Sequence, residues 1–136
     1  MNKKHADEFI GIPWAKYGTD YTTGVDCVGL VFLFYRDHLQ VYLPPIPEFE
    51  FNSPNPAHKD LVINFLTRAS FCQVDSPQFG DIITFGPSPL AGEHVGIFYD
   101  ALTVLHVREN KSSALEKINR IGRPTAFYRL GKRGVA

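Results

Sequence analysis

Cys27 has the sequence surroundings that best suit covalent chemistry. It follows Asp26 and directly precedes an apolar run, Val28 to Tyr35. Aspartate is a favoured helix N-cap, so this order predicts a buried helix with Cys27 in its first turn; a buried strand is the alternative. Unpaired N–H groups in a first helical turn act like about half a positive charge, which favours the thiolate and lowers the pKa of a cysteine. We therefore predict a nucleophile at Cys27, with a small packing residue as the alternative.

Two histidines are placed where they could serve this thiol. His94 begins a predicted strand after a loop rich in Gly, Pro and Ser, and His106 lies on the next predicted strand. A tight connection at 100–102 predicts an antiparallel hairpin, with His106 opposite or diagonal to His94. His106 would then accept a hydrogen bond from Nδ1–H of His94 and leave Nε2 to face the thiol. A strand histidine that covers apolar surface is the alternative for His106.

Gly29 and Asp26 lie beside Cys27 in the sequence and add to this picture. Gly29 removes a side chain beside the sulfur, which would let a substrate backbone approach. Asp26 is expected to act mainly as the cap, with contact to a substrate ammonium as the alternative. Cys72 has no histidine pattern near it and is predicted to be a half-buried core residue. Two distant cysteines make neither a disulfide framework nor a zinc site, so no metal and no cofactor are predicted.

The elements that must position these residues change type along the chain. Helical patterns are predicted over 5–10, after Asp26 and over 57–70, with loops over 17–24 and, rich in proline, over 43–56. Short β-rich segments predict strands at 81–85, 95–99, 103–107, 115–118 and 126–130. Helices first and strands afterwards imply an α+β domain in which N-terminal helices pack on a C-terminal antiparallel sheet. With 136 residues, the chain is expected to form a single domain, 1–136.

Composition excludes several other classes of function. Acidic and basic residues balance at fourteen each, so no overall field attracts nucleic acid or anionic lipid. The longest apolar run is far shorter than the about 20 residues that span a bilayer, which argues against membrane insertion. No secretory signal is visible, which predicts synthesis in the cytoplasm without a signal peptide.

Five segments together resemble the NlpC-type family of bacterial and phage cell-wall cysteine peptidases, compact relatives of papain. In order, they are GIPW at 11–14, DCVGLV at 26–31, FGDIITF at 79–85, HVGIF at 94–98 and LHV at 105–107. The resemblance implies a papain-like fold, with Cys27 as nucleophile, His94 as general base and His106 as the third polar residue. It also implies hydrolysis of an amide in the peptidoglycan stem peptide, often between D-glutamate and a diamino acid.

Two departures from the family pattern concern the substrate end of the site. Trp14 stands where members usually carry a tyrosine, and an indole donates only an N–H. Tyr17 or Tyr21 could supply the missing hydroxyl. Val28 stands where many members have serine. The predicted substrate-binding residues are therefore Trp14, Tyr17, Asp26 and Gly29.

The smaller phage-type members resemble this chain more closely, in length, in the proline-rich segment and in the ending FYRL at 127–130. This analogy predicts action at the cell wall, with a virion as one workplace and phage tail proteins as partners. A tail-assembly protein of the same fold with little hydrolase activity is an alternative, motivated by the missing tyrosine hydroxyl. An acyltransferase is a second alternative, which the absence of lipid-binding apolar stretches disfavours.

Overall fold

The candidate nucleophile begins helix α1 (Cys27–Asp37) in a computed structural model that describes residues 4–44, 66–86 and 94–131. Asp26 caps this helix, because its carboxylate accepts a hydrogen bond from the Gly29 N–H at 2.7 Å. The helix ends at Asp37, and the N–H of the C-cap residue His38 donates to the carbonyl oxygen of Phe34. The predicted helix and its N-cap are thus confirmed. None of the helices in the described ranges is long and apolar enough to cross a membrane.

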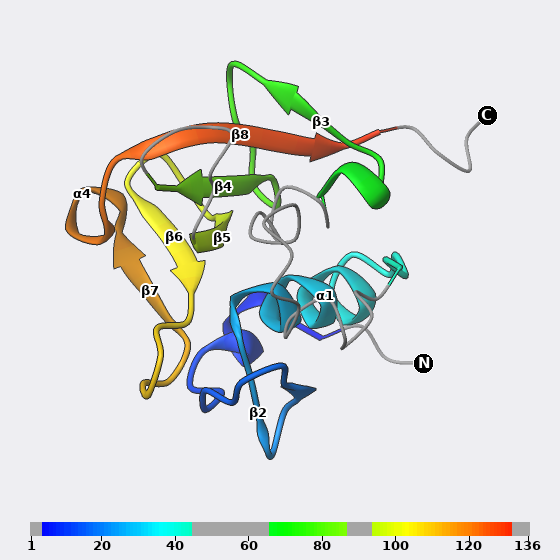
Figure 1. Ribbon diagram of the computed structural model, residues 1–136, viewed down its shortest axis with the longest axis vertical. Helices are drawn as coiled ribbons and strands as arrows, with labels where there is room; N and C mark the ends of the chain where they lie inside the picture. The colour runs from blue at the N-terminus through cyan, green and yellow to red at the C-terminus, as the bar shows by residue number, and fades with distance from the viewer. Residues whose placement is uncertain (1–3, 45–65, 87–93, 132–136) are drawn as a thin grey trace, which may run out of the picture.

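Six antiparallel strands form the second layer (Figure 1). They are β3 (Phe71–Val74), β4 (Ile82–Phe85), β5 (His94–Phe98), β6 (Thr103–His106), β7 (Ala114–Lys117) and β8 (Pro124–Leu130). Their order across the sheet is β3-β8-β4-β5-β6-β7, so the last strand of the chain lies between β3 and β4. Helix α1 packs against this sheet, which confirms the predicted α+β class.

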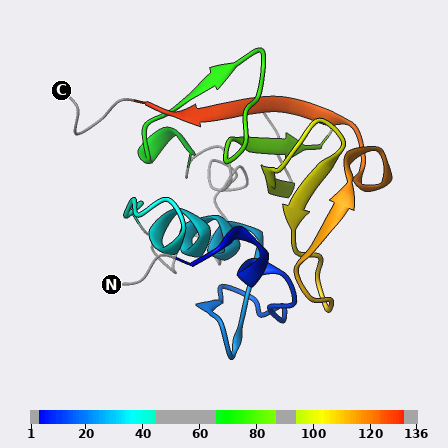
Figure 2. The same ribbon diagram turned by 180° about the vertical axis from the view of Figure 1, so that it is seen from behind.

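Short elements cover the side of α1 that faces away from the sheet. The 3-10 helix η1 (Ala6–Phe9) lies within the predicted helix over 5–10. Strands β1 (Thr19–Asp20) and β2 (Gly24–Val25) form a small hairpin where a loop was predicted over 17–24, and the second strand extends one residue beyond it. Figure 2, like Figure 1, shows α1 between these N-terminal elements and the large sheet.

Side-chain alternation along the strands divides the core into two clusters. Val95 of β5 lies in the cluster that packs on α1. Phe85, which pairs with His94 across β4 and β5, lies in a second cluster with residues of α4 (Ile118–Ile121). Successive side chains of a strand point to opposite faces, so His94 lies on the face away from α1. Cys27 must therefore approach His94 around the end of β5.

The predicted hairpin between the two histidines is present. Strands β5 and β6 are antiparallel, with Ile97 opposite Leu105, which places His106 diagonal to His94. The five predicted strands correspond to β4 to β8, with small shifts at their ends. Strand β3 and the single turn of α4 were not predicted.

The prediction for Cys72 was wrong. This cysteine is exposed, because it lies on the edge strand β3, whose one neighbour is β8. Both cysteines are free thiols. The proline-rich segment over 43–56 lies almost wholly outside the described residues, and of the helix predicted over 57–70 the described part shows helix at 66–68.

Candidate active site

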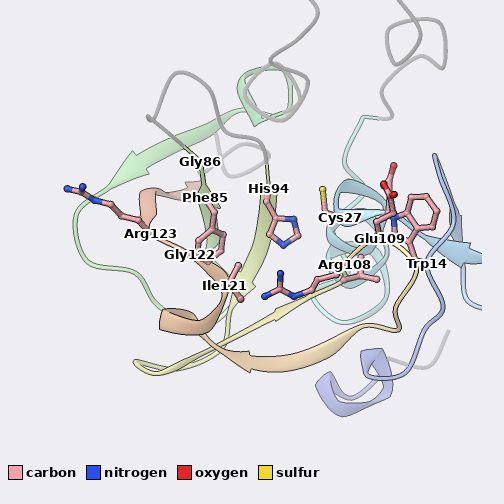
Figure 3. A pocket seen from close by; sticks show the side chains of 12 residues that line it. Trp14, Cys27, Phe85, Gly86, His94, Arg108, Glu109, Ile121, Gly122 and Arg123 are labelled. Carbon is pink, nitrogen blue, oxygen red and sulfur yellow. The ribbon is translucent and has the colours of Figure 1, made fainter.

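An open cleft of about 640 Å³ lies where the start of α1 meets the ends of strands β4, β5 and β6. Cys27 and His94 both line it, with Trp14 on the side of the thiol and Phe85 beside the imidazole. Figure 3 shows the His94 ring between Phe85 and the Cys27 sulfur. The far wall is formed by α4 and the residues that follow it. The cleft thus brings together two residues that are far apart in the sequence.

The Cys27 thiol is partly buried and uncharged in the resting protein. Loss of solvent around the sulfur, followed by the nearby negative charge of Asp26, raises its pKa to about 12. The backbone N–H of Val95 and the first N–H groups of α1 act in the opposite direction and do not outweigh desolvation. The predicted lowering of the Cys27 pKa was therefore wrong, because the burial of the sulfur could not be seen in the sequence.

Asp26 holds the loop before α1 as well as the helix start. Its second carboxylate oxygen accepts a hydrogen bond from the Tyr17 backbone N–H at 3.1 Å. Desolvation raises the pKa of this carboxyl group, against the hydrogen bonds from Gly29 and Tyr17. The cap function of Asp26 is therefore present. Asp26 also lines the cleft, and its contact with a substrate stays a prediction.

Close packing against the Gly18 backbone explains the glycine at position 29, and the sequence did not reveal this. A Cβ at this position would lie 1.8 Å from the Gly18 carbonyl oxygen and 3.2 Å from a carboxylate oxygen of Asp26. Gly29 is buried, and it is not among the described residues that line the cleft. The missing side chain lets the loop backbone approach the helix, and the predicted contact of Gly29 with a substrate stays a prediction.

The two histidines are in direct contact. His94 Nε2 and His106 Nδ1 are hydrogen-bonded at 2.8 Å. The nitrogen of His94 on the side of the Cys27 sulfur is Nδ1 (Figure 3). The predicted pairing of His94 and His106 is present, but the prediction exchanged the two nitrogens of His94. A single sequence gives no rotamer, so the assignment of the nitrogens needed the structure.

A glycine makes this diagonal contact possible. Continuing the register of Ile97 with Leu105 by one residue places His106 opposite Gly96. A Cβ on Gly96 would come within 2.6 Å of Val104 Cγ2 and 3.2 Å of His106 Cβ. The imidazole of His106 is 2% exposed, so His94 rests on a ring that is fixed in the core.

A carboxylate and a guanidinium extend the contact of the histidines across the sheet. His106 Nε2 lies 2.7 Å from Glu116 Oε1 on β7. Glu116 is also bonded to Arg108, whose Nε lies 3.3 Å from the same oxygen. Neither Glu116 nor Arg108 was predicted as a site residue. The available signal was weak, because an acidic residue in a short strand reveals its partner only once the β6–β7 register is known.

His94 is a neutral base in the resting protein. Burial, and then the nearby His106 and Arg108, lower its pKa to about 4, and the charge of Glu116 acts in the opposite direction. Both members of the thiol–imidazole pair are therefore uncharged near neutral pH. Any reaction of this thiol would therefore require a proton acceptor, and the His94 imidazole is a neutral base on the same cleft.

This lowered pKa predicts loss of stability in acid. The unfolded chain binds a proton at His94 near its ordinary pKa of about 6.5, whereas the folded chain does so near pKa 4, so the free energy of unfolding falls as pH drops through this window. We expect a loss of about 2 kcal/mol after allowance for partial exposure of the ring. Urea unfolding at about pH 7 and about pH 4.5 measures it. His94→Gln should reduce the loss and His5→Gln, at an exposed position, should keep it; equal pH dependence in all three proteins would contradict the prediction.

The remaining predicted residues divide between cleft and scaffold. Trp14 lines the cleft. It also forms an isolated β-bridge with Val25, which lies just before the capped helix. Tyr17 is not among the described residues that line the cleft, and it contributes its backbone N–H to Asp26. The cleft also contains charged residues that were not predicted, namely Arg108, Glu109 and Arg123.

Together, the capped helix with its thiol and the antiparallel sheet with its imidazole define a compact papain-like α+β domain. The NlpC/P60 family model matches residues 13–124, and the chain belongs to this family of cell-wall cysteine peptidases. The sequence has no significant match among curated proteins.

Solved structures of the same family share the fold. The NlpC/p60 domain of the peptidoglycan hydrolase SagA matches with a TM-score of 0.66 and 18% identity, over 92% of each chain. An NlpC/P60 family protein from Bacillus cereus matches with a TM-score of 0.63 and 21% identity, over 90% of this chain and 37% of that one. The peptidoglycan hydrolase RipB from Mycobacterium tuberculosis matches with a TM-score of 0.56 and 20% identity, over 90% and 59%.

Proposed function

We propose that this protein is a cysteine endopeptidase that hydrolyses an amide bond in peptidoglycan stem peptides. Cys27 is the nucleophile, His94 the general base and His106 the residue that orients His94. The observation that carries the proposal is the placement of Cys27 and His94 on one open cleft, with His94 hydrogen-bonded to the buried His106. SagA and RipB, which share the fold, are both named as peptidoglycan hydrolases.

The proposed reaction begins with a neutral thiol and a neutral imidazole. His94 Nδ1 takes the proton from Cys27 Sγ as the sulfur attacks the scissile carbonyl, and the backbone N–H of Cys27 helps to hold the developing oxyanion. One such donor typically contributes about 3 kcal/mol to the transition state. His94 then gives its proton to the leaving amine, and an acyl-enzyme remains. In the second half, His94 takes a proton from water, which attacks the thioester and releases the free thiol.

We propose the bond between D-glutamate and a diamino acid as the one cleaved. A stem peptide presents both carboxylate and ammonium groups there. The cleft has side chains of both types, namely the acidic Asp26 and Glu109 and the positively charged Arg108 and Arg123. Trp14 is proposed to bind substrate beside the thiol through its ring and indole N–H. Tyr17 is proposed to act indirectly, through the backbone bond that fixes Asp26.

We further propose that the workplace is the cell wall, reached after synthesis in the cytoplasm, with phage tail proteins as partners in a virion. The support is the resemblance to small phage members of the family. The alternative is a structural tail protein of the same fold with little hydrolase activity. It is favoured if Trp14 cannot perform the function of the usual tyrosine.

Mass spectrometry of stem-peptide fragments tests the proposed reaction. Purified muropeptides are incubated with the protein under reducing conditions in ¹⁸O-labelled water. The expected result is a pair of products, of which the one ending in D-glutamate carries ¹⁸O at its new carboxylate. Cleavage at another amide would reject the proposed bond and still support peptidase activity. Intact muropeptides after long incubation would favour the structural tail protein.

A further inference from the structure

Three polar side chains occupy successive diagonal positions on one face of the sheet. His94 on β5 contacts His106 on β6 at 2.8 Å, and His106 contacts Glu116 on β7 at 2.7 Å. Strand register supports this, because His106 pairs with Ala114, two residues before Glu116. The chain of contacts therefore runs across three neighbouring strands from the cleft to a carboxylate.

We propose that Glu116 is a positioning residue that sets the tautomers of both histidines, and so leaves His94 Nδ1 unprotonated toward the thiol. The proposal rests on the proposed function for its effect on catalysis, but the tautomers themselves can be measured without any substrate.

The direction of the hydrogen bonds follows from the chemistry of the acceptor. An ionised carboxylate can only accept hydrogen bonds, so His106 must carry its proton on Nε2, the nitrogen that faces Glu116. The Nδ1 of a neutral His106 is then an acceptor, and it requires a proton on His94 Nε2. A neutral His94 has no second ring proton. Its Nδ1 therefore keeps a lone pair on the side of the Cys27 sulfur, as a general base needs.

Arg108 keeps the carboxylate ionised and in place. Its Nε lies 3.3 Å from Oε1 of Glu116 and its terminal nitrogen lies 3.4 Å from Oε2. The same terminal nitrogen donates to the Arg120 carbonyl oxygen at 3.3 Å, which ties the guanidinium to α4. The bonds from Arg108 and His106 lower the pKa of Glu116, so Glu116 is a carboxylate near neutral pH.

Other titratable and charged groups lie near the histidines and bear on any pH measurement. Asp26 and Cys27, at the start of α1, line the same cleft as His94, and so do Arg108 and Glu109, which follow β6. Among the charged side chains of the described residues, Glu116 is the one that is hydrogen-bonded to the His106 ring, at 2.7 Å. The Glu116 side chain is 30% exposed, whereas that of His106 is 2% exposed, so Glu116 can be replaced with little effect on the core.

Nitrogen-15 NMR of the imidazoles tests the proposal in the whole protein. At about pH 7.5 both His94 and His106 should carry the proton on Nε2, with assignments from His94→Gln and His106→Gln spectra. In Glu116→Gln, the amide can donate to His106 Nε2, which moves one proton to each Nδ1 and should give a mixture of tautomers. Glu116→Met, which has no strong acceptor, should also shift the populations. Asp75→Asn, an exposed carboxylate with the same change of charge, should leave the spectra unchanged.

Kinetics provide the second measurement. In Glu116→Gln, kcat for stem-peptide hydrolysis should fall by roughly 10–100-fold with KM nearly unchanged, by analogy with the partners that orient metal-binding histidines. A wild-type His94 protonated on Nδ1, or unchanged tautomers in both Glu116 variants, overturns the proposal. Shifted tautomers in a protein whose wild type cleaves no muropeptide would support the positioning of the histidines and reject the proposed function.

Discussion

Cys27→Ala is expected to reduce hydrolysis of stem peptides by at least ~10⁴-fold, because removing the nucleophile of a catalytic triad leaves only binding and oxyanion stabilisation. Alanine keeps the N-terminal turn of α1 and the Asp26 cap, so the variant should remain folded. Release of labelled fragments over time, at equal protein concentration, measures the loss.

Cys72→Ala is the matched control for this variant. Cys72 is an exposed free thiol on β3, whereas Cys27 lines the cleft, so the control removes a thiol without touching the site. It should retain wild-type activity. Wild-type activity in both cysteine variants would reject Cys27 as the nucleophile. Loss of activity in both would point to a general effect on the fold.

Gly29→Ala is expected to lower the free energy of unfolding by about 3 kcal/mol and to abolish activity. The added methyl would lie 1.8 Å from the Gly18 carbonyl oxygen, and that backbone cannot retreat freely. A Cβ on Gly18 would itself lie 2.2 Å from the Gly24 carbonyl oxygen, so the loop is already packed on its other side. Overpacking of this kind typically costs about 1–3 kcal/mol, and contact with backbone belongs at the upper end.

Urea unfolding followed by circular dichroism measures this change in stability. Gly131→Ala is the control, because the nearest atom to its new Cβ would be the Ser70 carbonyl oxygen at 3.1 Å. We expect a loss below about 1 kcal/mol there, with activity retained. A stable and active Gly29→Ala variant would show that the loop moves away from α1, and that the close approach of Gly18 is not needed to position Cys27.

The start of α1 and the β5–β6 hairpin followed from local sequence signals. Asp26 before an apolar run is sufficient for an N-cap, because the cap bond joins residues three apart. The tight connection after Phe98 is sufficient for an antiparallel hairpin, which places His106 diagonal to His94. Both features depend on neighbours in the chain, so local sequence was enough to predict the helix, the hairpin and the pair of histidines.

The pKa values and contacts of these groups depend on how distant segments of the chain pack together. The pKa of Cys27 is raised by burial, and burial depends on how α1 packs against the sheet. Gly29 is required by a loop eleven residues earlier, whose path is set by tertiary contacts. Glu116 reaches His106 through the register of β6 and β7, and His94 contacts it through Nε2 because of the rotamer that this packing allows. Desolvation and contacts between distant segments arise only when the layers assemble, so no local pattern encodes them.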